Sequence, residues 1–156
     1  MEIVGYSEHW ADAFASLNYE WIEKYFAVER HDREILGDPE KYVIELGGQI
    51  FMAILEGQAV GTVALIPASQ EVLELTKMAV LPKFQGRGIG DVLMSASVKF
   101  ARDQNYSMIF LESHHKLAPA LSLYRKHGFV DVARDPNSLY SRADVRMELA
   151  INGDNM

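Results

Sequence analysis

Residues 85–90 read Gln85-Gly86-Arg87-Gly88-Ile89-Gly90, and this stretch carries the sharpest local signal in the chain. Three glycines in five positions let the backbone approach a ligand closely. Apolar residues at helical spacing follow, so the stretch is predicted to open a helix, where unpaired N–H groups attract anions. The stretch therefore predicts a phosphate-binding loop, although the glycines alone would equally suit a tight connection between a strand and a helix.

The charge around this loop agrees with phosphate binding. The 156-residue chain is acidic, with 15 Lys and Arg against 22 Asp and Glu and a net charge of −7. The window from Lys77 to Arg87 nevertheless holds three basic residues and no acid. The overall charge argues against nucleic acid, whose binding depends on neutralising phosphates. The local window still permits a small phosphate-bearing ligand.

Length and composition limit the class of protein. A chain of this length is expected to form one domain over residues 1–156. The longest apolar run, residues 50–55, is far shorter than the roughly 20 residues of a membrane-spanning helix. The first residues do not resemble a signal peptide, so we expect a cytoplasmic protein with no membrane partner. The absence of cysteine excludes disulfides, thiolate nucleophiles and Cys-ligated zinc.

Hydrophobic periodicity predicts a mixed α/β or α+β fold. Helices are expected over residues 7–26 (capped by Ser7), 88–104 and 117–127, a short solvated helix and loop over 29–41, and strands over 49–55, 59–66, 72–80, 107–112, 129–133 and 145–151. Strict alternation along residues 72–80 places Glu74 on the strand face of Met78 and Val80, and Lys77 on the opposite face with Leu73, Leu75 and Ala79.

Three other nucleotide-binding patterns fit the glycine loop less well. A dinucleotide fingerprint needs glycine at position 91, which is Asp91, and a P-loop needs a Gly-Lys-Ser/Thr ending that is absent. The glycine spacing does match S-adenosylmethionine-dependent methyltransferases. In those enzymes, however, the loop follows the first strand and an acidic residue, whereas here Gln85 precedes it and three predicted strands have passed.

Two motifs together resemble the GNAT superfamily of acyl-CoA-dependent N-acetyltransferases. Its hallmark, Arg/Gln-x-x-Gly-x-Gly/Ala, is met by Gln85, Gly88 and Gly90, and residues 78–82 (Met-Ala-Val-Leu-Pro) look like the family's splayed strand and its proline. Downstream, residues 120–129 look like the signature Ala-x-x-Leu-Tyr-x-Lys-x-Gly-Phe. The resemblance covers about residues 49–129. It implies a mixed, mostly antiparallel sheet of about six or seven strands flanked by helices.

The resemblance also implies an acetyl-CoA site and no metal. Backbone groups of the splayed strand would bind the pantetheine arm, and amides of the glycine loop would hold the pyrophosphate, with Arg87 or Lys83 near the remaining phosphate. The implied cofactor-binding residues are Met78, Ala79, Val80, Gln85, Gly86, Arg87, Gly88, Ile89, Gly90, Ala120 and Lys126. Ser113 and His114 join this set because Leu117 stands where the family often has a pantetheine-binding Asn. His114 and His115 lack metal-ligand spacing, and neighbouring side chains usually point apart.

Two residues are implied as catalytic. Tyr124 would protonate the departing thiolate, although its helical spacing would also suit a core aromatic. An alkylamine is mostly protonated at neutral pH, with a lysine pKa near ~10.4 as reference, so a base is needed. Glu74 stands where histone-acetylating relatives place a glutamate base, and Glu112 is the second candidate. With no cysteine and no evident activated serine, direct transfer in a ternary complex is expected.

The acceptor is predicted only as a primary amine of a small molecule, amino acid or peptide. Acceptor pockets in the family use regions that here are residues 21–41 and 135–142. These contain Tyr25, His31, Asn137, Tyr140 and Arg142. Arg142 would suit an acceptor carboxylate, whereas the acidic charge of the chain would suit a cationic acceptor. A non-catalytic acyl-CoA-binding module is the alternative function, a methyltransferase is a third, and homodimerisation is common among the relatives.

Overall fold

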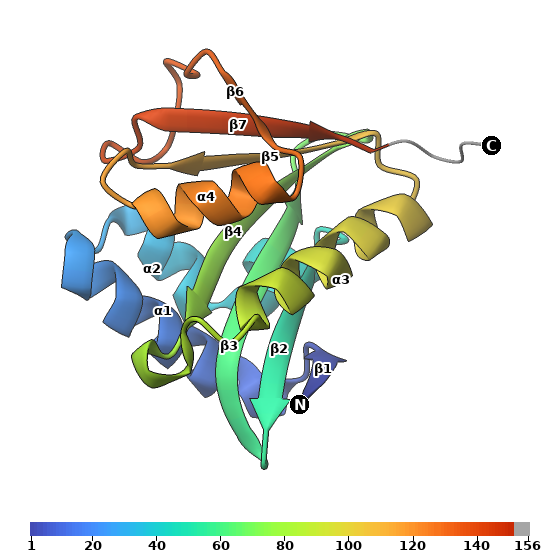
Figure 1. Ribbon diagram of the computed structural model, residues 1–156. Helices are drawn as coiled ribbons and strands as arrows, with labels where there is room; N and C mark the ends of the chain where they lie inside the picture. The colour runs from blue at the N-terminus through green and yellow to red at the C-terminus, as the bar shows by residue number, and fades with distance from the viewer. Residues whose placement is uncertain (152–156) are drawn as a thin grey trace.

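The computed structural model describes residues 1–151, over which seven strands form one mixed sheet with helices on both faces (Figure 1). The sheet order is β1-β2-β3-β4-β5-β7-β6. The strands are β1 (Glu2–Gly5), β2 (Gln49–Leu55), β3 (Gln58–Pro67), β4 (Val72–Val80), β5 (Met108–Ser113), β6 (Val130–Val132) and β7 (Val145–Ala150). The helices are η1 (Glu8–Trp10), α1 (Ala11–Tyr25), α2 (Arg30–Gly37), η2 (Glu40–Ile44), η3 (Pro82–Phe84), α3 (Ile89–Asp103) and α4 (Ala118–Lys126). The predicted domain extends to residue 156, and residues 152–156 lie outside this description.

The predicted fold class is confirmed. Among the described strands, β4 and β5 run parallel and every other neighbouring pair is antiparallel. The β4–β5 register covers only residues 72–74 and 108–110. Beyond Glu74 the two strands separate, which leaves the second half of β4 paired with β3 on one side and free on the other. The splayed strand that the motif predicted is therefore present.

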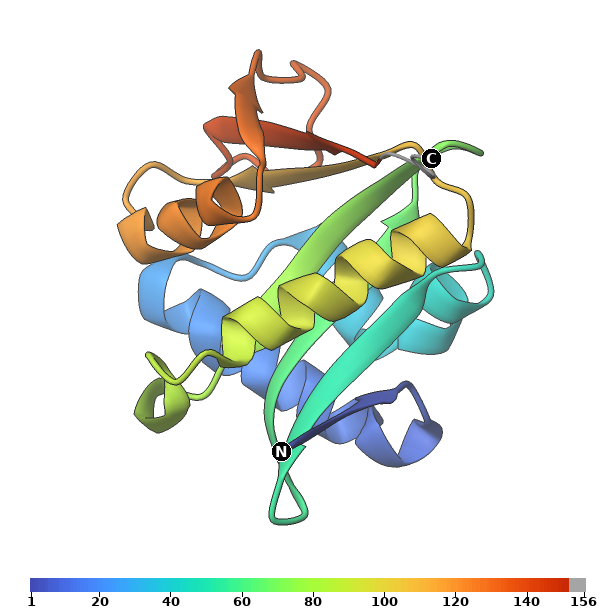
Figure 2. The ribbon, with the colours of Figure 1, turned by 45° about the vertical axis from the view of Figure 1, so that its right-hand side comes forward.

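Two hydrophobic cores lie on opposite faces of the sheet. Leu93 and Met94 of α3 and Leu121 of α4 pack on one face, and Phe14 of α1 and Ile35 of α2 pack on the other. Figure 2 shows α3 crossing the front of the sheet, with α1 and α2 behind it. Burial of these apolar stripes explains why the periodicity identified the helices correctly.

The N-terminal region corrects three predictions. The strand β1 was not predicted, and the first α-helix begins at Ala11, after a 3₁₀ turn, with no side-chain cap from Ser7. The helix α2 was predicted to be solvated, yet Asp32, Ile35 and Leu36 are buried. Its dense charge was misleading because Asp32 has buried partners far away in sequence. A π-helical turn, η2, follows α2.

A β-bulge at Lys77 corrects the predicted faces of β4. Lys77 has φ 55°, and Val63 of β3 faces both Lys77 and Met78, since Thr62 pairs with Ala79 and Ala64 with Thr76. The extra residue reverses the alternation. Met78 and Val80 therefore pack on the α3 face with Leu73 and Leu75, whereas Ala79 belongs to the α1 core. Glu74 does not share the face of Met78 and Val80.

Candidate active site

A groove runs between the free half of β4, the start of α3 and α4. Its lining comprises Trp21, Tyr25, Met78, Ala79, Val80, Phe84, Gln85, Gly86, Gly88, Ile89, Gly90, Asp91, Leu117, Pro119, Ala120, Leu123 and Tyr124. Nine of the predicted cofactor-binding residues are in this set: Met78, Ala79, Val80, Gln85, Gly86, Gly88, Ile89, Gly90 and Ala120. The structure therefore brings together the two motifs that the sequence separates by about 30 residues.

The backbone of the glycine loop, residues 86–90, has a conformation that residues with a side chain rarely adopt. Gly86 and Gly88 have φ 77° and 82°, in the left-handed region that favours glycine. Gly88 is the N-cap of α3, so the first amides of this 15-residue helix lack intrahelical partners and lie at the groove. Asp91 in the first turn would repel a phosphate, but its carboxylate is engaged by Lys126 at 2.9 Å and by His127 at 2.8 Å. The loop thus keeps the features of an anion site.

Four predicted cofactor residues lie outside the groove lining. Lys126 pairs with Asp91 instead, and the exposed Arg87 guanidinium stacks 5.1 Å from the Phe84 ring centre. Ser113 and His114 line the neighbouring pocket. The sequence also missed a contact within the motif: the Gln85 side chain donates a hydrogen bond of 3.1 Å to the Val80 carbonyl. This bond fixes the chain between the end of β4 and the glycine loop.

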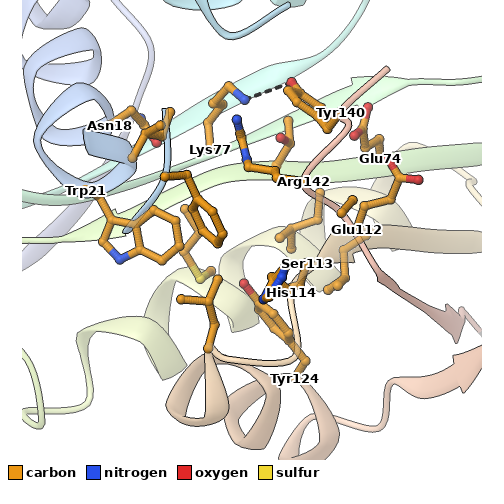
Figure 3. A pocket seen from close by; sticks show the side chains of 18 residues that line it. Asn18, Trp21, Glu74, Lys77, Glu112, Ser113, His114, Tyr124, Tyr140 and Arg142 are labelled. Carbon is orange, nitrogen blue, oxygen red and sulfur yellow. Dashed lines mark hydrogen bonds between the residues drawn. The ribbon is translucent and has the colours of Figure 1, made fainter. Parts of the chain in front are cut away.

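A second pocket opens on the other side of Tyr124, between α1, β4, β5 and the β6–β7 loop (Figure 3). Trp21, Met78, Leu117 and Tyr124 line both this pocket and the groove. The other lining residues are Asn18, Ile22, Phe26, Glu74, Leu75, Thr76, Lys77, Leu111, Glu112, Ser113, His114, Tyr140, Arg142 and Ala143. We call this cavity the acceptor pocket, because it contains Trp21, Tyr140 and Arg142 from the regions in which the sequence predicts the acceptor. The two cavities meet at the side chain that the sequence proposed as the acid.

Tyr124 lies at this junction, and Glu74 lines the acceptor pocket but not the groove. Burial raises the pKa of the Tyr124 phenol to about 12, so the hydroxyl keeps its proton at neutral pH. Burial also raises the pKa of the Glu74 carboxyl to about 7, with Lys77 opposing this shift and Glu112 adding to it. A carboxyl with a pKa near neutrality is matched to general-base work. Glu112 lies on the adjacent strand and accepts a 2.9 Å hydrogen bond from Ser138.

A buried charge network forms the back of the acceptor pocket. The Lys77 ammonium donates to Asp32 at 2.7 Å and to the Tyr140 hydroxyl at 2.8 Å. The Arg142 guanidinium binds both oxygens of the same carboxylate, at 2.7 and 2.8 Å. Although burial opposes ionisation, Arg142 and Lys77 hold the pKa of Asp32 well below its usual range. Lys77 was assigned to the phosphate-binding window, and this was wrong because the bulge directs it to α2.

The predicted acceptor residues are scattered more widely. Tyr140 and Arg142 line the acceptor pocket, whereas Tyr25 lines the groove. His31 contacts the Tyr140 ring, with 5.2 Å between the ring centres. Asn137 lies exposed in the β6–β7 loop and belongs to neither lining. Asn18 and Thr76 also line the pocket but lie outside the regions predicted to hold the acceptor, because nothing in their spacing separates them from ordinary packing residues. Trp21 is the first residue of the predicted region 21–41 and lines both cavities.

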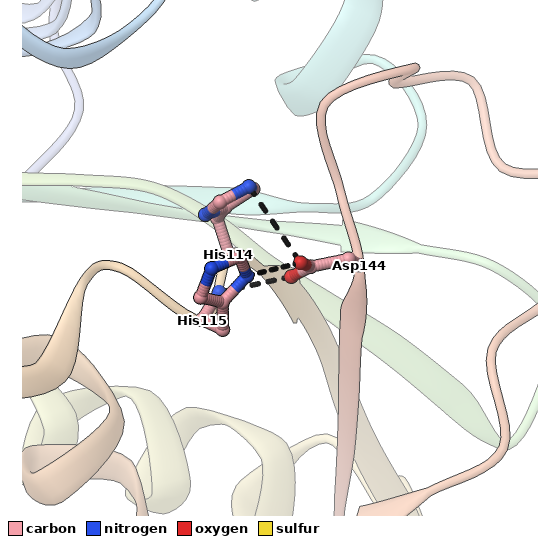
Figure 4. Close-up of side chains that lie close together, drawn as sticks. All are labelled: His114, His115 and Asp144. Carbon is pink, nitrogen blue, oxygen red and sulfur yellow. Dashed lines mark hydrogen bonds and ion pairs between the residues drawn. The ribbon is translucent and has the colours of Figure 1, made fainter.

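The two adjacent histidines do not point apart as expected. The ring centres of His114 and His115 are 4.3 Å apart, and both rings face Asp144 (Figure 4). Asp144 accepts hydrogen bonds from the backbone and the ring of His115. One potential ligand atom from each of the three residues lies within 4.8 Å of the others. In the structure the cluster joins the end of β5 to the start of β7.

The comparisons with known proteins identify the family. Residues 6–129 match the Acetyltransferase (GNAT) family, and the chain belongs to this family. The chain is 32% identical over 99 residues to N-acetyltransferase family 8 member 2 of Rattus norvegicus, covering 60% of this chain and 44% of that protein. It thus spans less than half the length of this relative.

Solved structures show the same fold. A GNAT-family acetyltransferase from Staphylococcus aureus superposes with a TM-score of 0.89 at 22% identity, covering 97% of this chain and 99% of that one. The yncA structure from Salmonella typhimurium, which contains its cofactor acetyl-CoA, gives a TM-score of 0.80 at 19% identity and covers 100% of this chain and 96% of that one.

Within residues 1–151, no helix has the length and apolar character needed to cross a bilayer.

Proposed function

We propose that this protein is an acetyl-CoA-dependent N-acetyltransferase that acetylates a primary amine by direct attack in a ternary complex. One observation carries the proposal: the groove built by the glycine loop and the acceptor pocket built around Glu74 meet at Tyr124. Two substrates bound in these cavities would bring their reacting atoms together beside one phenol and near one carboxyl. Such positioning converts a bimolecular step into an effectively unimolecular one.

The groove fits the chemistry of coenzyme A. The free half of β4 offers backbone groups that can pair with an extended amide arm, as in strand addition. The first amides of α3 and the left-handed glycines suit a pyrophosphate. Met78, Ala79 and Val80 would therefore contact the pantetheine arm, and residues 86–90 the pyrophosphate. The thioester itself would be supplied by the bound acetyl-CoA.

The side chains on the two sides of the junction have complementary roles. Glu74, directly or through water, would remove a proton from the acceptor ammonium, whose neutral nitrogen then attacks the thioester carbonyl. A nitrogen–carbon bond forms and the carbon–sulfur bond breaks. Tyr124 would donate its proton to the departing thiolate and regain one from the attacking nitrogen, so the products are an amide and a thiol. The absence of cysteine agrees with a route without an acyl-enzyme.

Thermal unfolding with candidate cofactors tests the proposal. Acetyl-CoA at about 100 times its dissociation constant should add about 2.7 kcal/mol to the free energy of unfolding, whereas S-adenosylmethionine should add nothing. Release of thiol from acetyl-CoA with a panel of amines, amino acids and peptides then measures turnover. Stabilisation without turnover on any acceptor would identify a non-catalytic acyl-CoA-binding module. Stabilisation by S-adenosylmethionine alone would identify a methyltransferase.

A further inference from the structure

The cations that line the acceptor pocket are already paired with acids of the protein. Arg142 makes a bidentate pair with Asp32 and a further contact of 3.3 Å with Glu29. Lys77 is bonded to Asp32 and Tyr140. The positive charges of Lys77 and Arg142 therefore face the negative charges of Asp32 and Glu29. This network offers no free cation to an anionic acceptor.

Two carboxyl groups of the pocket are not neutralised in this way. Glu74 and Glu112 have no basic side chain within ion-pair distance among residues 1–151. Glu112 accepts a hydrogen bond from Ser138 through one oxygen. Arg146 stands opposite Glu112 in the β5–β7 register, but its guanidinium pairs with Glu148 at 3.7 Å and lies over the Phe110 ring at 4.0 Å. The pocket wall formed by β4 and β5 therefore carries more carboxyl groups than basic groups.

The sheet register places these two carboxyl groups on one face. Glu74 pairs with Phe110 across the parallel β4–β5 ladder, and Glu112 follows Phe110 by two residues. Residues two apart in a strand point to the same side. Both side chains line the acceptor pocket, and Figure 3 shows them together on the side away from Trp21. One carboxyl can therefore act on the reacting nitrogen while the other binds a second group of the same molecule.

We infer that the acceptor is a diamine or polyamine, and that Glu112 binds its second, non-reacting ammonium group. This inference rests on the proposed acetyltransferase function. A carboxylate-bearing acceptor would have to separate Arg142 from Asp32, whose side chain is completely buried, and would also face two carboxyl groups. A second ammonium instead supplies the basic partner that Glu112 lacks among residues 1–151, through a charge-assisted hydrogen bond.

Three amines of equal chain length test the inference with acetyl-CoA as donor. They are 1,4-diaminobutane, butylamine and 4-aminobutyrate, each with four carbons and one amine at the first carbon. The fourth carbon carries an ammonium in the diamine, is a methyl group in butylamine and is a carboxylate in 4-aminobutyrate. We expect kcat/KM for the diamine to exceed that for butylamine by about tenfold or more, as for a charged hydrogen bond, and 4-aminobutyrate to be the poorest acceptor. Because the wild-type protein is compared with itself, no variant needs to fold.

The variant Glu112→Gln then tests whether Glu112 binds the second ammonium group. The variant keeps an oxygen for Ser138 but loses the charge, so the preference for the diamine over butylamine should fall about tenfold toward one. Asp103→Asn is the control, because it removes an exposed carboxylate that is paired with Lys99 and lines neither cavity, and it should keep the preference. Any of three outcomes would overturn the inference and leave the proposed function intact. The three amines could be turned over at equal rates, 4-aminobutyrate could be the preferred acceptor, or the preference for the diamine could be unchanged in Glu112→Gln. Failure of every amine, amino acid and peptide would overturn both.

Discussion

The ammonium nitrogen of Lys77 lies 2.7 Å from Oδ1 of Asp32, 45 positions earlier in the chain. The Lys77 side chain is 3% exposed and that of Asp32 is fully buried. The pair ties α2 to the bulge of β4, and Arg142 joins it from the β6–β7 loop. Two segments that line the acceptor pocket, β4 and the β6–β7 loop, are therefore tied to α2 by one carboxylate.

Asp32→Asn should lower the free energy of unfolding by about 3–5 kcal/mol, because it leaves the buried Lys77 without its counter-ion and Arg142 with only Glu29. Urea unfolding measures the change. Asp103→Asn is the matched control, since its pair with Lys99 is exposed and should contribute less than about 1 kcal/mol. Equal losses in the two variants would show that the buried network does not stabilise the fold in this way.

Glu74→Gln should lower kcat by about 10²-fold or more, the usual contribution of a general base. The wild-type rate should rise with pH through about 7, as the Glu74 carboxyl loses its proton and becomes able to accept one. The variant should lose this limb of the profile. A pH–rate profile with an unchanged limb near pH 7 in Glu74→Gln would assign the base to another group.

The same substitution should stabilise the fold at alkaline pH. The pKa of Glu74 rises from 4.5 to about 7 on folding, so the folded state binds the proton more tightly than the unfolded chain. Protonated Glu74 therefore contributes fully to the free energy of unfolding below pH 4.5, and this contribution is lost as the pH rises toward 7. At pH 8 Glu74→Gln should therefore gain about 1–3 kcal/mol, and at pH 4 little. Unfolding at both pH values measures the difference, and a loss of stability at pH 8 would contradict it.

Tyr124→Phe should lower kcat by about 10²-fold while leaving the affinity for acetyl-CoA nearly unchanged, because only the proton donor is removed. Tyr106→Phe is the control, since Tyr106 packs on the same core and lines neither cavity. Thiol release and titration calorimetry measure the two quantities. A loss of affinity equal to the loss of rate would indicate a packing role for Tyr124 instead.

Gly88→Ala should weaken acetyl-CoA binding and destabilise the chain by about 1–2 kcal/mol, because φ 82° is costly for a residue with a Cβ atom. A Cβ at this position meets no other atom within 4 Å, so backbone conformation alone carries the effect. Gly37→Ala, in α2, meets equally open space without a left-handed φ and should be neutral or stabilising. If the two variants melt alike, the loop does not depend on its left-handed backbone.

The local sequence determined most of the elements, the family and most of the motif residues that line the groove. The glycine loop, the apolar stripes of α3 and α4 and the strand that ends at Val80 are contiguous patterns, and their physics depends on near neighbours. Periodicity and turn chemistry are therefore enough to place them. Tyr124 was singled out in the same way, because its motif is a contiguous stretch over α4 and the turn that follows it.

The tertiary structure decided the acceptor side. The bulge at Lys77 depends on how β3 and β4 pair, so alternation along one strand could not show it. The solvated interpretation of α2 failed because the partners of Asp32 come from residues 77 and 142. Pairing across such distances decides which charges are neutralised and which stay free. For that reason the sequence left Arg142 as a candidate receptor for a carboxylate, and only the fold shows that Asp32 already occupies it.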